Sequence, residues 1–127
     1  MDKLNFDTGV KSYRINGGGV LRFNPADPNV YTRFLAAAEE IKAAEIQLQQ
    51  TTDALAAVAE QDKKVKALLG GVFPGNDFDA LLGSVNLLAV ASNGKPVVTN
   101  LLEALQPVLT EGAKLCAKNI AAGAQKA

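Results

Sequence analysis

The apolar positions of this chain follow a two-residue period near its start and a helical period afterwards. Two short apolar segments flank the turn sequence Asn16-Gly17, and in the second segment Leu21 and Phe23 fall on one face by parity. Asn-Gly between apolar segments is the strongest short-range signal for a β-hairpin, because both residues tolerate a positive φ. The pattern therefore predicts a hairpin over residues 8–24, with a helix covering the face that carries Phe23.

A proline-containing sequence, Asn24-Pro25-Ala26-Asp27-Pro28, follows the predicted hairpin. Proline cannot donate to a β-ladder, so we expect Pro25 to end the hairpin. Asp27 is expected to cap the next helix, with Pro28 at its first position, where the missing N–H removes no hydrogen bond.

Residues 29–60 contain no glycine or proline, and their apolar residues recur every seven positions. Each repeat begins with a large residue, and in most repeats the residue three positions later is smaller. This spacing favours a narrow helical seam, which either packs inside the protein or binds another helix. The large positions are Phe34, Ile41, Leu48 and Leu55, and the second set is Ala37, Ala44, Thr51 and Val58.

A single helix over this segment would be about 50 Å long, which exceeds the ~30 Å diameter of a small domain. The helix must therefore break or project from the domain. Thr51-Thr52-Asp53 is the expected break, because these residue types favour N-caps over helix interiors.

Three further helices are predicted after the first. The second ends at Leu69, before Gly70-Gly71, and the third starts after Asp77 and passes Leu82 to about Ala91. The last helix opens at Asn100, which forms a capping-box pattern with Glu103, and Pro107 is expected to kink it.

These elements predict one domain over residues 1–127, mainly α with a small β part (α+β). A hairpin region (1–24) precedes a helical region (28–123) of about four helices in a small bundle with a long first helix, and residues 124–127 are expected to fray. The residues with expected structural roles are Asn16, Gly17, Phe23, Pro25, Asp27 and Pro107.

Composition argues against several classes of function. Thirteen basic and thirteen acidic residues give a formal net charge of zero, which argues against nucleic-acid binding. The chain has no histidine and one cysteine, so an internal disulfide, histidine-ligated metals and histidine-based triads are excluded. We expect no enzyme activity, no cofactor and no metal. No signal-peptide pattern and no apolar segment of about 18 residues is present, so we expect no contact with a membrane.

The remaining chemical motifs have simple structural interpretations. Gly17-Gly18-Gly19 lacks the pattern of a phosphate-binding loop, which favours a turn. Asn76, Asp77 and Asp79 lack calcium-loop spacing, which favours helix capping over a weak cation site. Cys116 has no histidine to activate it, so a structural thiol is favoured over a nucleophile.

Three segments carry a resemblance to a known family. The sequence Leu21-Arg22-Phe23-Asn24-Pro25-Ala26-Asp27, followed by Tyr31-Thr32-Arg33-Phe34, resembles the N-terminus of small phage and prophage tail assembly chaperones from siphophages of Gram-positive hosts. Residues 65–76 and 101–109 are similar to later helices of that family. This chain departs from the family in a shorter charged segment between the first two long helices, and in alanine and leucine where the family has acidic and aromatic residues.

The resemblance implies a non-enzymatic protein of the bacterial host cytoplasm. Such a chaperone would bind the helical tape-measure protein and help recruit tail tube subunits, and it could form homo-oligomers. The alternatives are a minor virion structural or connector subunit and a small helical protein-binding adaptor. The predicted partner-binding residues are Phe34, Ile41, Leu48, Leu55 and Val58, with Phe23 anchoring the hairpin to the first helix.

Overall fold

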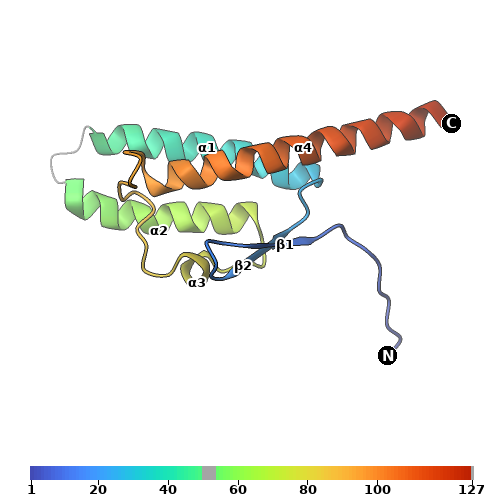
Figure 1. Ribbon diagram of the computed structural model, residues 1–127, viewed down its shortest axis with the longest axis horizontal. Helices are drawn as coiled ribbons and strands as arrows, with labels where there is room; N and C mark the ends of the chain where they lie inside the picture. Colours follow the sequence, from blue (N-terminus) through green and yellow to red (C-terminus); the bar gives the residue numbers. More distant parts are fainter. Residues whose placement is uncertain (50–53, 127) are drawn as a thin grey trace.

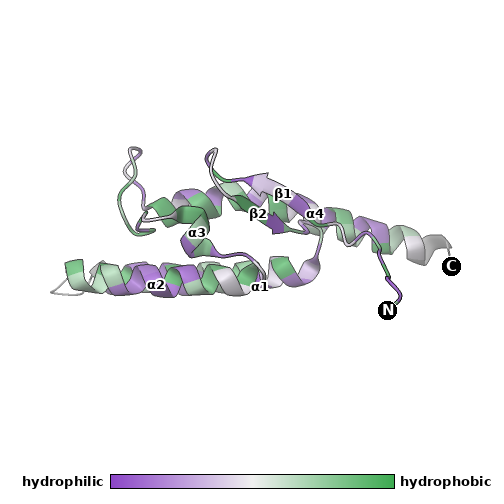
Figure 2. Ribbon diagram, turned by 90° about the horizontal axis from the view of Figure 1, so that it is seen from below, coloured by the Kyte–Doolittle hydropathy of each residue, from purple (hydrophilic) through white to green (hydrophobic). Residues whose placement is uncertain are grey.

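The computed structural model describes residues 1–49 and 54–126, which form two layers (Figures 1 and 2). One layer contains α1 (Pro28–Gln49) and α2 (Ala54–Val72), which lie side by side. The other contains the hairpin of β1 (Lys11–Arg14) and β2 (Val20–Phe23), the short α3 (Phe78–Leu82) and the long α4 (Val97–Lys126). The predicted fold class, an N-terminal hairpin followed by four helices, is confirmed.

The hairpin has the predicted turn. Asn16 and Gly17 have φ values of 50° and 74°, and the N–H of Gly18 donates to the carbonyl of Ile15 at 2.8 Å. In the antiparallel register Tyr13 lies opposite Leu21. Leu21 and Phe23 are buried as their parity predicts, whereas the intervening Arg22 is exposed.

The outer edge of β2 is closed by one side chain. The N–H of Arg22 donates to Oδ1 of Asn76 at 2.8 Å, and Nδ2 of Asn76 donates to the carbonyl of Arg22 at 2.9 Å. The same nitrogen donates to the carbonyl of Phe73, also at 2.9 Å. The amide of Asn76 thus takes the place of a neighbouring strand and fixes the turn after α2 against the hairpin.

Aromatic rings join the hairpin to the end of the second helix. Phe23 stacks on Tyr13 with ring centroids 4.9 Å apart, and it contacts Phe73 at 4.7 Å. Phe73 directly follows α2 and contacts Phe78 of α3 at 6.0 Å. These ring contacts link Phe23 to the end of α2 and to α3, and Phe23 also belongs to the same buried cluster as Val30 and Phe34 of α1.

The seven-residue pattern is divided between two antiparallel helices. Nε of Arg33, near the start of α1, donates to the carbonyl of Val72, the last residue of α2, at 3.1 Å. A single 50 Å helix therefore does not form. The expected break at Thr51-Thr52-Asp53 lies outside the described residues. Asp27 caps α1 as predicted, since its Oδ1 accepts the N–H of Asn29 at 2.9 Å.

Two predicted helix ends are wrong. The second helix continues through Gly70-Gly71 to Val72, because Val72 and the following Phe73 are both buried in the core. The third helix is capped by Asp77 as predicted, but it ends at Leu82 rather than near Ala91. The chain turns at Gly83, whose φ of 59° is not helical.

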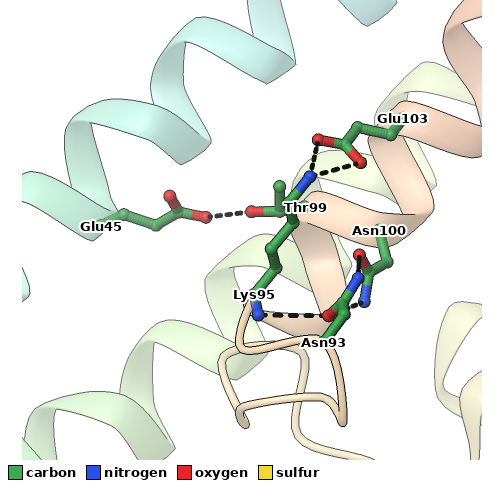
Figure 3. Close-up of polar contacts among 6 residues, drawn as sticks. All are labelled: Glu45, Asn93, Lys95, Thr99, Asn100 and Glu103. Carbon is green, nitrogen blue, oxygen red and sulfur yellow. Dashed lines mark hydrogen bonds and ion pairs between the residues drawn. The ribbon is translucent and has the colours of Figure 1, made fainter.

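The last helix also differs from its prediction. It begins at Val97, and the capping box does not form, because Asn100 bonds to Asn93 while Glu103 pairs with Nζ of Lys95 at 3.0 Å (Figure 3). The helix continues through Pro107 and extends to Lys126, and residue 127 of the segment expected to fray lies outside the described residues.

At Gly112, α4 lies against the backbone of Pro25 and Ala26, the segment between the hairpin and α1. A methyl group on Gly112 would overlap the carbonyl oxygen of Pro25 and lie 2.9 Å from the backbone nitrogen of Ala26. Glycine inside a helix costs about 1 kcal/mol relative to alanine. Here it lets α4 lie directly on the segment that joins the hairpin to α1.

We predict that Gly112→Ala destabilises the protein, because the added methyl group forces α4 away from Pro25. The expected loss is about 2 kcal/mol in the free energy of unfolding, measured by chemical denaturation. Gly123→Ala is the matched control in the same helix, since no atom lies within 4 Å of the added carbon. The control should be neutral or slightly stabilising, and an equal loss in both variants would contradict the close contact.

Candidate helix-binding groove

The predicted partner-binding residues lie in three different environments. Phe34 and Ile41 are 4% and 1% exposed and belong to the protein's own core, so their prediction as a free surface is wrong. Leu48 and Val58 are half-buried and line a shallow depression. Leu55 is 86% exposed and is the only one of the five that is fully available to a partner.

The core explains why the first half of the pattern faces inward. Apolar residues on one side of α1 and of α2 meet the hairpin and α4 across the layers. In this arrangement the first half of the seven-residue seam packs in the protein's own hydrophobic core. The buried residues of the two helices are Val30, Phe34, Ala37, Ile41, Val65, Leu69 and Val72.

A groove runs between α1 and α2, on the flank of each helix next to its buried face, and Leu68 on its floor also packs against the core. Its volume is about 690 Å³. Small side chains dominate its floor, so another backbone can approach both helices closely. The floor is formed by Ala43, Ala44, Ala67, Leu68 and Gly71, and the rims by Glu40, Gln47, Gln61 and Lys64.

The rims combine polar and oppositely charged groups. Glu40 belongs to α1 and Lys64 to α2, and both are exposed. An apolar floor between polar rims matches an amphipathic helix, whose apolar stripe would face the floor while its polar flanks meet the rims.

The carboxylate of Asp62 ties α2 to the segment before α4. Its Oδ1 accepts the N–H of Leu87 at 2.8 Å. Its Oδ2 lies 2.9 Å from Nζ of Lys66 within the same helix, and the Asp62 and Lys66 side chains are only 14% and 10% exposed. Neither residue lines the groove.

The other predicted chemical motifs have structural roles. Asn76 holds β2, and Oδ1 of Asp77 accepts the N–H groups of Asp79 and Ala80, so the capping interpretation is confirmed. Cys116 is half-buried in α4. Within residues 1–49 and 54–126, no three acidic or cysteine side chains converge on a point that could hold a metal ion. No described helix has the length and hydropathy needed to span a bilayer.

Comparisons with known proteins add no assignment. Neither a protein-family model, nor a curated protein, nor a solved structure matches this chain. The groove and the sequence resemblance are therefore the two observations that bear on function.

We predict that Ile41→Asp unfolds the protein, whereas Leu55→Asp leaves it folded. The first variant places an unpaired carboxylate in the core and should cost more than about 4 kcal/mol, but the second places one in solvent. Circular dichroism during thermal unfolding measures both variants. A folded Ile41→Asp variant would contradict the inward orientation of this residue.

Proposed function

We propose that this protein is a non-enzymatic tail assembly chaperone that holds helical segments of a phage tape-measure protein in the groove between α1 and α2. By the same proposal it acts in the cytoplasm of the bacterial host and helps recruit tail tube subunits. The observation that carries the proposal is the uncovered groove with its floor of small residues.

The dimensions of the groove suit a short stretch of a helical partner. Its lining residues run from Glu40 to Gln47 on α1 and from Gln61 to Gly71 on α2, so one copy contacts about two to three turns of a partner helix. A tape-measure protein that waits for its tube exposes apolar stripes over great length, and such stripes promote aggregation. Many copies bound along it would cover these stripes.

The composition of the groove favours weak, reversible binding. Alanine and glycine bury little apolar area per residue, and the exposed charges at the rims contribute little energy. A chaperone must leave when tube subunits polymerise, and low affinity at each site allows this. Several weak sites on one long partner still give high overall occupancy.

The segments that carry the family resemblance have defined roles in this fold. Asn24 accepts the N–H of Ala26, and Asp27 caps α1, so the first segment directs the chain from the hairpin into the long helix. Residues 65–76 form the end of α2 and the turn that closes β2. The resemblance therefore falls on residues that shape the start of α1 and the end of α2.

We predict that filling the groove weakens binding to the tape-measure protein. Replacing Ala43 and Ala67 with glutamine keeps good helix formers at two exposed positions and blocks the floor. The double variant should bind about tenfold more weakly, measured by titration of the purified proteins. The matched control is Ala117→Gln with Ala121→Gln on α4, where both alanines are exposed and lie outside the groove.

A pull-down of the tagged protein from phage-producing cells, together with analysis of purified virions, separates the candidate functions. Co-elution of a tape-measure or tube protein and absence of the bait from virions would support the chaperone. The bait in finished virions would instead indicate a structural or connector subunit. No phage partner at all would indicate an adaptor with a different target.

A further inference from the structure

A second cavity lies between the hairpin and α4. Its volume is about 580 Å³, and apolar side chains form most of its walls. Tyr13 and Ile15 contribute to it from β1 and the turn, while Leu101, Ala104 and Val108 contribute from α4. The cavity thus lies beside an edge strand and under a helix.

The outer edge of β1 is open. Ser12 lies opposite Arg22 in the register, and Arg22 directs its N–H and carbonyl away from β1 to Asn76. In an antiparallel pair of this type the partner residue points its own N–H and carbonyl to the opposite edge. Among the described residues, no backbone hydrogen bond joins Ser12 or Arg14 to a third strand. A strand added at this edge would direct alternate side chains toward the cavity.

The first residues of the chain have the pattern of such a strand. Leu4 and Phe6 are 87% and 74% exposed and are spaced two positions apart, so they share one face of an extended segment. Polar residues alternate with them at positions 3, 5 and 7. This segment, residues 3–8, is here named the N-terminal arm.

The structure directs the arm away from its own edge strand. Nδ2 of Asn24 donates to the carbonyl of Thr8 at 2.9 Å, and the N–H of Gly9 donates to Asp7 at 2.8 Å. These bonds hold the base of the arm near the end of β2, and the chain leaves the body from there (Figure 1). The apolar residues of the arm therefore remain exposed in one copy while the cavity beside β1 remains unfilled.

Charge favours contact between the arm and the edge strand. β1 carries the exposed Lys11 and Arg14. Asp7 lies in the arm next to Phe6, and Asp2 lies directly before the arm, so a carboxylate near each end of the apolar pair can face these basic residues; Lys3 is the one basic side chain of the arm. Opposite charges on adjacent strands stabilise their pairing.

We propose that the N-terminal arm of one copy adds as a strand to β1 of a second copy, and that Leu4 and Phe6 enter the cavity between the hairpin and α4. The arm supplies both the backbone hydrogen bonds that the edge lacks and the apolar side chains that the cavity lacks. This inference does not depend on the proposed chaperone function, since it concerns only contacts between copies of this chain.

Sedimentation velocity over a concentration series tests the proposal. The parent protein should self-associate, and the double variant Leu4→Asp with Phe6→Asp should associate about tenfold more weakly or not at all. Ser12→Pro should have the same effect, because it removes the outward N–H at the edge without removing a bond between β1 and β2. Ile120→Asp is the control, since it changes a residue that is 67% exposed on α4.

A labelled peptide of residues 1–8 provides the second measurement. It should bind to the full-length Leu4→Asp, Phe6→Asp variant and bind about tenfold more weakly when Ser12→Pro is added. Circular dichroism checks that each variant is folded. A parent protein that is monomeric at every concentration would overturn the proposal, as would unchanged peptide binding after Ser12→Pro or equal loss of association in the Ile120→Asp control.

Discussion

The contact between Gly112 and the backbone of Pro25 fixes how the two layers of this protein meet. Because no side chain separates them, α4 lies against the segment between the hairpin and α1. The same placement brings α4 over the buried face of the hairpin and beside α1, where Thr99 bonds to Glu45. With α4 in this position the hydrophobic core is covered, and the core involves only one side of α1 and of α2.

This division separates the residues that stabilise the fold from those proposed to bind a partner. The large members of the seven-residue pattern, Phe34 and Ile41, face the interior. The groove on the flank of each helix is built from small residues such as Ala43 and Ala67, whose replacement leaves no cavity in the core. Substitutions at these two positions should therefore cost little stability.

Local signals in the sequence predicted much of the fold, because hairpin turns and helix caps depend on neighbouring residues. Asn16-Gly17, Asp27 and Asp77 have the predicted roles. The helix ends at residues 72 and 97 depend instead on burial and on side-chain contacts between the helix and the loop before it, which the apolar pattern does not report. The groove was not predicted because most of its small residues give no apolar period: Ala44 belongs to the seven-residue seam, whereas Ala43, Ala67 and Gly71 lie outside it. Only the persistence of alanine along two helices could have indicated it.

The proposed seating of a tape-measure helix against α2 is tested most directly by site-specific crosslinking in phage-producing cells. A photo-crosslinking amino acid is placed at position 67, on the groove floor, and in a parallel strain at position 117 on α4. The account predicts that position 67 crosslinks to the tape-measure protein before tails are assembled and that position 117 does not. No crosslink from position 67, or an equal yield from both positions, would contradict it.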